Sequence, residues 1–381
     1  MGLRLGNQRI CPVVYADKPW RPNPLWADIK SIVENDTRDY KGKVGVIMYN
    51  FSDVSNFTLG GTLRAAIATS DGAFYTYAKD GANVTHHWDT TKDVDDGNGY
   101  KTRWVIYYYA SDNISDRFDK YDSTSDNQYG WAGNYIAYAV VRANLTNGYQ
   151  LFYKQHMLER IDNTGYVMRV TSLYSAFCEC RKLTSVPTME TTGLTTLNNA
   201  FRDCYVIKEM PYLDTAKVTS FGAFCYRCDG LVKTQDVFDT SSATNLGSIF
   251  MYCPQLKKMP VLTDMSKNTS FTYSCYGMYS LVDAGEIDLS NLSQVFADSN
   301  RPFVNTYSLE HIKLKMPSNS DMWLNTSEVV SIASFRYIAD HAPDVSATPR
   351  TLTINATNIA RINASDPTII TDLQAKGWTV A

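Results

Sequence analysis

A repeated segment is the feature of this sequence that most constrains its fold. Between residues 171 and 293, five copies begin 24 or 25 residues apart. Their first residues are Thr171, Thr195, Thr219, Thr244 and Thr269. Counted from that threonine, position 3 is Leu or Phe, position 10 is Cys in four copies and Met in the fifth, and position 13 is Leu or Ile. Columns of one chemical class predict a solenoid, because each coil buries the same positions against its neighbours.

Spacing inside one copy predicts how a coil is built. Positions 7, 10 and 13 lie three apart, which is typical of one face of a short helical turn. Positions 13, 16 and 19 continue as an apolar series, for example Leu183, Val186 and Met189, and a proline follows position 16 in three copies. Proline there favours a short strand or a bend that leaves it. Five coils at strand spacing would extend over about 24 Å.

The repeats also resemble a known family. The motif AF-x-x-C-x-x-L, from Ala176 to Leu183, is similar to the BspA-like leucine-rich repeats. Thr351–Thr353 and the ending AKGWTV, Ala375–Val380, resemble the segment that closes such repeats in gut-phage and prophage proteins. The opening LGNQRICP, Leu5–Pro12, resembles virion proteins of tailed phages of gut Bacteroidetes, including crAss-like phages. The resemblance implies display and adhesion rather than catalysis.

The chain departs from the family in two respects. Copy three has Phe224 and Cys225 shifted by one position, and copy five has Cys275 and Met278 at positions 7 and 10. The start of the chain has no apolar run of secretory length, unlike the bacterial surface adhesins of the family. We therefore expect a phage protein that is made in the host cytoplasm and whose cysteines are thiols.

Composition argues against two functional classes. The chain of 381 residues has a formal net charge of −3 and no block of Lys and Arg, which argues against nucleic-acid binding. No stretch has the apolar length of a transmembrane helix, so membrane insertion is not expected. The 26 tyrosines are unusual. Tyrosine suits strands and exposed contact surfaces, because it buries area with few rotatable bonds.

We expect a mainly β fold with some α, in four consecutive regions. They are an N-terminal virion-attachment arm, an antiparallel β-sandwich or jelly roll, a leucine-rich-repeat solenoid and an α/β C-terminal cap, at residues 1–40, 41–160, 161–295 and 296–381. The first region is rich in proline and is expected to be irregular. With Trp20 and Trp26 among its prolines, it is either an unstructured leader or an arm that docks onto other virion proteins. In the cap, we expect a helix from Thr326 to Ala342.

Candidate metal sites have simpler explanations. Four repeat cysteines fill one column that otherwise holds Met, which is typical of a small core hydrophobe rather than a zinc ligand. His86 and His87 are adjacent in a strand-like run and would point to opposite faces. Asp93–Gly97 is similar to a calcium loop, but Trp104 stands where an EF-hand needs Glu. We expect no metal and no cofactor, and the chain has no P-loop, dinucleotide-binding or nucleophile-elbow motif.

The candidate ligand surface is the predicted strand face of the solenoid. Polar positions between its apolar columns provide five nominees: Lys208, Glu209, Tyr212, Lys257 and Lys258. The alternative is a solvated face without a ligand, because charged residues beside core columns are common.

These expectations favour a bacteriophage virion structural protein, of head or tail fibre-like type, that is not an enzyme. It would attach to other virion proteins through its arm and contact a host-surface glycan or protein through its repeats. It would form a homo-oligomer, and the likeness to phage fibres favours a trimer. Two alternatives stay open, a bacterial adhesin or carbohydrate-binding protein and a phage depolymerase, since a catalytic carboxylate pair is defined by a distance in space.

Overall fold

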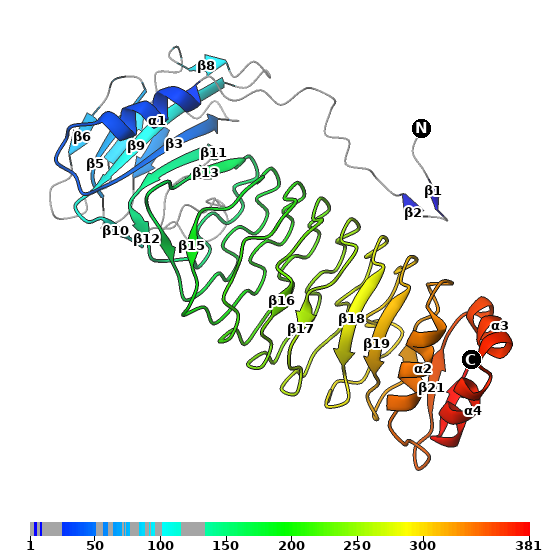
Figure 1. Cartoon of the computed structure of the whole chain (residues 1–381). Helices are drawn as coiled ribbons and strands as arrows, with labels where there is room; N and C mark the ends of the chain where they lie inside the picture. The colour runs from blue at the N-terminus through cyan, green and yellow to red at the C-terminus, as the bar shows by residue number, and fades with distance from the viewer. Residues whose placement is uncertain are drawn as a thin grey trace.

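The computed structural model is elongated, with a sheet at one end and helices at the other (Figure 1). It describes residues 4–5, 8–9, 25–50, 56–59, 64–70, 72, 74–76, 84–87, 91, 93–95, 101–115 and 134–381. A stack of coils joins the sheet to three helices near the C-terminus. The predicted fold class, mainly β with some α, is confirmed.

A seven-stranded sheet forms the first part of the described chain. Its order is β13-β11-β3-β9-β5-β6, with β8 also paired to β9, and every pair is antiparallel except β13 with β11. The strands are β3 Gly42–Asn50, β5 Arg64–Thr69, β6 Phe74–Thr76, β8 Val94–Asp95, β9 Lys101–Tyr109, β11 Asn134–Arg142 and β13 Arg160–Asp162. Two further antiparallel pairs join β1 Arg4–Leu5 to β2 Gln8–Arg9 and β4 Asn56–Leu59 to β7 Val84–His87.

Helix α1, Leu25–Asn35, covers one face of the seven-stranded sheet (Figure 1). Leu25, Ile29 and Val33 recur every four residues and are buried against the sheet. Gly45 in β3 permits this close approach, since a Cβ there would lie 2.6 Å from Val33 Cγ2. The other face of the sheet continues into the core of the coils, which includes Val44 and Val46 from the same strand.

Two predictions for the N-terminal half need correction. Residues 25–35 of the arm predicted to be irregular are helical, because the last proline of the segment, Pro24, precedes the helix instead of interrupting it. The antiparallel sandwich predicted for residues 41–160 is not confirmed. In the part of the chain that the structure describes, α1 covers one face of the sheet, and the coils, with their short parallel strands, cover the other.

The repeat copies lie side by side in register. Position 2 forms parallel bridges from copy to copy, joining Thr196 to Ser220, Ser220 to Asn245 and Asn245 to Ser270. Short strands of neighbouring coils also pair in parallel, in three groups. The first group is β10 Asn113–Ile114, β12 Asn144–Leu145, β14 Met168–Arg169 and β15 Met189–Glu190. The other two are β16 Val237–Phe238 with β17 Val261–Leu262, and β18 Asp283–Asp288 with β19 His311–Lys315. The apolar columns at positions 3, 7, 10 and 13 are buried in one continuous core, as their periodicity predicts.

The stack extends beyond the five copies recognised in the sequence. A preceding coil begins at Thr146, and its Phe152 N–H donates to the Ala176 carbonyl at 2.7 Å. A following coil begins at Ala297, and its Val304 carbonyl accepts from the Gly277 N–H at 2.8 Å. The stack therefore passes both boundaries of the predicted repeat region, 161–295.

Each coil turns sharply at positions 5 and 9. The non-glycine residues there adopt a left-handed backbone with φ between 51° and 61°, namely Gln150, Lys154, Ser175, Glu179, Asn199, Asp203, Ala223, Arg227, Ser248, Tyr252, Tyr273 and Asn305. This conformation costs a non-glycine residue about 1 kcal/mol or more. For ten of these twelve residues the next coil offsets the cost by accepting a hydrogen bond from the backbone N–H; Glu179 N, for example, donates to the Arg202 carbonyl at 2.7 Å.

The C-terminal end closes the stack with a mixture of helix and strand. Its elements are β20 Met322–Trp323, α2 Ile332–His341, β21 Arg350–Thr353, α3 Ala356–Ser365, α4 Thr368–Ala375 and β22 Trp378–Val380. The three strands pair in parallel, in the order β20-β21-β22. The predicted helix starts later than expected, because the Ser327 hydroxyl donates to the Leu309 carbonyl of the last coil and Ser331 becomes the N-cap.

Candidate ligand-binding surface

The buried cysteine column contributes to the packing of the coils. The thiol of each column-ten cysteine donates to a position-7 carbonyl of the preceding coil: Cys180 to Phe152, Cys204 to Phe177, Cys228 to Phe201 and Cys253 to Cys225, at 2.9–3.1 Å. Burial raises the pKa of these thiols well above 9.0, so they stay protonated donors. Their burial was predicted from the sequence and is confirmed, but the hydrogen bond was not foreseen.

A threonine ladder joins the coils at position 1. The hydroxyl and the backbone N–H of Thr219 both donate to the Thr195 carbonyl, at 3.1 and 2.9 Å. Thr195, Thr244 and Thr269 repeat this arrangement on the threonine before them. The threonine that marks each copy in the sequence therefore supports the stacking of coils.

The five nominated residues lie together on what we call the strand face, the exposed positions 14, 15 and 18 of the coils. Lys208, Glu209, Lys257 and Lys258 are exposed, and Tyr212 is 77% exposed. Parallel bridges from Glu209 to Lys233 and from Lys258 to Asp283 place these positions on neighbouring coils. Exposed valines stand between the nominees, at Val232, Val237 and Val261. The structure brings the nominees onto one surface without joining them into a contiguous charged site.

A different set of side chains follows the stack at positions 8, 9 and 11. We call it the aromatic–arginine face, and it comprises Arg181, Arg202, Asp203, Tyr205, Tyr226, Arg227, Tyr252 and Tyr276. Each of these residues contacts another on an adjacent coil. The tight turns at positions 5 and 9 bring these side chains to the surface, where the two arginines at 202 and 227 are exposed and the tyrosines are half-buried.

Arginine and tyrosine alternate on the N-terminal half of this face. The Arg202 guanidinium lies 5.0 Å from the centre of the Tyr226 ring, and Arg227 lies 5.3 Å from that of Tyr205. The Asp203 carboxylate is 3.3 Å from Arg202 and 3.6 Å from Arg227. Cation–π and ion-pair contacts therefore fix the orientation of these rings before any ligand arrives.

The second half of the face is purely aromatic. Tyr226 and Tyr252 have ring centres 6.0 Å apart, and Tyr252 and Tyr276 have ring centres 5.2 Å apart. Tyr279 and Tyr307 stack in parallel farther along, at 5.9 Å. Burial, followed by the hydrogen bond with Tyr276, raises the pKa of Tyr252 to about 12, so its hydroxyl is neutral at physiological pH.

Carboxylates on and beside the face are engaged by basic residues. A hydrogen bond with His156 lowers the pKa of Glu179 to about 2, and Arg181 lies 3.0 Å from the same carboxylate. Burial raises the pKa of Asp229, although Arg227 opposes this effect. The face thus offers aromatic rings, arginine N–H donors and carboxylate acceptors with little uncompensated charge.

Sequence analysis missed this face because it searched for columns of one chemical class. Positions 8, 9 and 11 hold Tyr, Arg, Asp, Glu, Cys, Met, Pro and Gly in changing order, so no single column stands out. A usable signal was present nevertheless. Copies two to four each carry one tyrosine at these positions, at Tyr205, Tyr226 and Tyr252, and copy five carries two, at Tyr276 and Tyr279.

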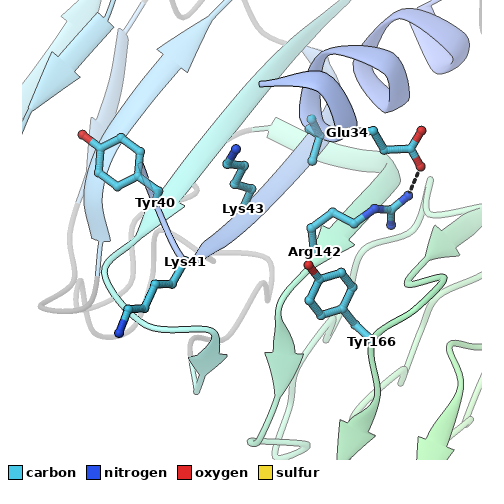
Figure 2. Close-up of a pocket in the computed structure, with 7 residues that line it drawn as sticks. Glu34, Tyr40, Lys41, Lys43, Arg142 and Tyr166 are labelled. Atoms are coloured by element: carbon cyan, nitrogen blue, oxygen red, sulfur yellow. Dashed lines mark hydrogen bonds and ion pairs between the residues drawn. The ribbon is translucent and has the colours of Figure 1, made fainter. Parts of the chain in front are cut away.

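An open pocket of about 230 Å³ lies where α1 meets β11 (Figure 2). It is lined by Val33, Glu34, Tyr40, Lys41, Lys43, Arg142 and Tyr166. Arg142 donates to the Glu34 carboxylate (Figure 2). Arg142 also donates to the Asp162 carbonyl at 3.2 Å, and Lys43 donates to the Asp36 carbonyl at 2.5 Å. These ion pairs and hydrogen bonds join helix to sheet, so we assign the pocket a structural role.

The remaining candidates from the sequence have structural roles or lie outside the described residues. Asp93 pairs with the buried Arg103 at 2.7 Å. Trp26 is half-buried in α1, with its ring 5.2 Å from that of Tyr138, and Trp20 lies outside the described residues. Among the residues described, no group of three His, Cys, Asp or Glu side chains is placed to hold a metal ion.

Comparisons with known proteins supply no relative. Neither the family models, nor the curated proteins, nor the solved structures give a match to this chain. The helices of the described residues are all too short or too polar to cross a bilayer. Any function must therefore be argued from the geometry of the surface itself.

Proposed function

We propose that this protein is a structural protein of a bacteriophage virion, fibre-like in type, whose coils form a leucine-rich-repeat module displayed to a host surface. The observation that supports this most is the aromatic–arginine face, which runs without a break across coils from Arg181 to Tyr276. Tyrosine and arginine are the residues most enriched at protein contact surfaces. A long module with such a surface suits adhesion.

Binding is favoured over catalysis by the state of the carboxylates. Glu179 and Asp203 each lie within ion-pair distance of arginine, so both carboxylates are already engaged by basic side chains. A glycosidase needs one carboxylic acid with a raised pKa at a set distance from a second carboxylate. The low pKa of Glu179 is the opposite of what a general acid requires.

Attachment to the particle is assigned to the segment before α1. Trp26 packs on Tyr138 within the chain, so its ring serves the protein's own sheet. Trp20 and the prolines around it therefore remain the proposed docking residues. A homo-oligomer, with a trimer favoured, would place several modules on one particle and raise weak contacts to useful avidity.

Mass spectrometry of purified phage particles tests the virion role. We expect the full-length chain among the particle proteins, and a chain lacking residues 1–24 to fold but to be lost from particles. Absence of the full-length chain from particles would contradict the proposal. Release of oligosaccharide from host capsule by the purified protein would favour a depolymerase instead.

A further inference from the structure

We infer that the aromatic–arginine face binds an uncharged polysaccharide, as an extended chain that lies across successive coils. The inference rests on the proposed adhesive function and adds the ligand class and the surface that holds it. Three features carry it: the regular spacing of the rings, the chemistry of the side chains and the balance of charge.

The spacing of the rings favours a linear polymer. Stacked coils repeat at about the spacing of neighbouring strands, roughly 4.8 Å. The ring centres of Tyr226, Tyr252 and Tyr276 on three successive coils are 6.0 and 5.2 Å apart. Neighbouring rings cross edge to face, at 85° and 76°, so a chain of sugar rings would meet an aromatic face or edge on each coil in turn. A compact ligand would use only one or two coils.

The side-chain chemistry matches the two sides of a sugar. A sugar ring has C–H groups that pack on an aromatic face and hydroxyls at its edge that donate and accept hydrogen bonds. Tyr252 and Tyr276 supply aromatic surface, together with the parts of the Tyr205 and Tyr226 rings that the guanidinium groups of Arg227 and Arg202 leave open. Arg202, Arg227 and Asp203 supply donors and acceptors beside Tyr205 and Tyr226, and their mutual contacts hold the rings in place. Such preorganisation reduces the entropy lost on binding.

The charge balance favours an uncharged ligand over an acidic one. Arg181 lies 3.0 Å from the Glu179 carboxylate, and Arg202 and Arg227 share the Asp203 carboxylate at 3.3 and 3.6 Å, so most of the positive charge of the face is compensated. The strand face differs, because no ion pair between described residues involves Lys208, Lys257 or Lys258. An acidic polysaccharide would therefore prefer the strand face, and its binding would weaken with added salt.

Affinity electrophoresis and calorimetry on the full-length protein test the inference. The probes are neutral glucans, mannans, galactans and xylans, with hyaluronan and alginate as acidic comparisons. We expect at least one neutral polysaccharide to bind, with an affinity that rises with oligosaccharide length and hardly changes with salt. Tyr226→Ala and Tyr252→Ala should each weaken binding by about tenfold. Tyr252→Phe, which keeps the ring, should bind nearly as well as the parent.

The matched control is Tyr212→Ala, the same substitution on the strand face, which should leave affinity unchanged. The inference is overturned if Tyr212→Ala weakens binding and Tyr226→Ala does not. It is also overturned if no neutral probe binds, or if only the acidic probes bind and salt abolishes their binding. If the protein binds a neutral glycan but is absent from particles, the virion role is contradicted and the polysaccharide inference stands. If the protein is present in particles but binds no neutral glycan, the polysaccharide inference is contradicted and the virion role stands.

Discussion

The seven-stranded sheet and the stack of coils bury polar groups in opposite ways. In the sheet region the buried groups are charged: the side chain of Arg142 is 10% exposed and that of Asp162 is 4% exposed, and they lie 3.4 Å apart. In the stack the buried polar groups are mostly neutral, as the Cys204 thiol and its column show, and Asp203, 7% exposed, is the charged exception among the buried residues described there. The reason lies in the repetition. A charge placed in one column would recur about every 5 Å along the stack and repel its copies, whereas a neutral donor can recur without that cost.

The buried carboxylate of the sheet and the buried thiols of the stack also respond differently to pH. Burial alone would raise the pKa of Asp162, but hydrogen bonds from Lys30 and Thr164 and the charge of Arg142 outweigh it and lower the pKa. This contribution to the stability of the sheet is present above the carboxyl's usual pKa and is lost as the pH falls below it. The thiols of the stack have raised pKa values, so their contribution is lost as the pH rises.

Placing a charge in the thiol column should have the largest effect. Cys204→Asp buries a carboxylate opposite the Phe177 carbonyl, where nothing compensates its charge. We expect a loss of about 4 kcal/mol or more in the free energy of unfolding, or failure to fold. Lys208→Asp, at an exposed position of the same coil, is the control and should change stability by less than about 0.5 kcal/mol. Equal urea midpoints for the two variants would contradict the claim that the cysteine column is more sensitive to a charge than the surface is.

Removing a buried charge from the sheet region should have the next largest effect. Arg142→Met keeps the aliphatic bulk but leaves Asp162 with one cationic partner fewer, at a cost of about 3 kcal/mol. Hydrogen exchange should accelerate in α1 and β11 and stay unchanged in the distal coils. Arg169→Met breaks an exposed pair with Glu190 and should cost less than about 1 kcal/mol. A global rather than local loss of protection would show that the two regions unfold as one unit.

Alkaline pH should destabilise the stack through its thiols. The Cys204 thiol titrates near 9.0 when unfolded and well above that when folded, so above pH 9 only the unfolded chain loses this proton. The free energy of unfolding then falls as pH rises, by about 1.4 kcal/mol per thiol at pH 10. Urea unfolding in the presence of a reductant would compare the parent with Cys204→Ala at pH 7 and pH 10. Their difference in stability should shrink by that amount, and an unchanged difference would contradict the assignment.

The threonine ladder should have the smallest effect. Thr219→Val removes a hydroxyl that donates to the Thr195 carbonyl, while the backbone N–H keeps its own bond to the same oxygen. Because Thr219 is exposed, water replaces part of the interaction, and we expect a loss of about 0.5–1 kcal/mol. Thr219→Ser, which retains the hydroxyl, should lose less. Thermal unfolding of the two variants distinguishes the hydroxyl from the β-branched methyl.

The periodicity predicted the stacking register and the buried columns, but it underestimated the length of the stack. The coil that begins at Thr146 has Gly148 and Gln155 at positions 3 and 10, outside the apolar classes of the other copies. Gln155 faces the sheet, where its side-chain oxygen accepts from the Ile136 N–H at 2.8 Å. This coil packs against the sheet on one side and against the next coil on the other. Its sequence therefore departs from the apolar columns that the later copies share.

The sequence by itself determined which residues of each coil are buried, because every coil repeats the same environment and one chemical class fills each column. Only the tertiary structure decided which exposed residues act together. The nominated lysines and Tyr212 share a face but alternate with valines, whereas Arg227 meets Tyr205, and Arg202 meets Tyr226, from different positions of adjacent coils. Such a surface depends on how adjacent coils align their turns. No single column carries that information, since each contact joins side chains about 25 residues apart in the chain.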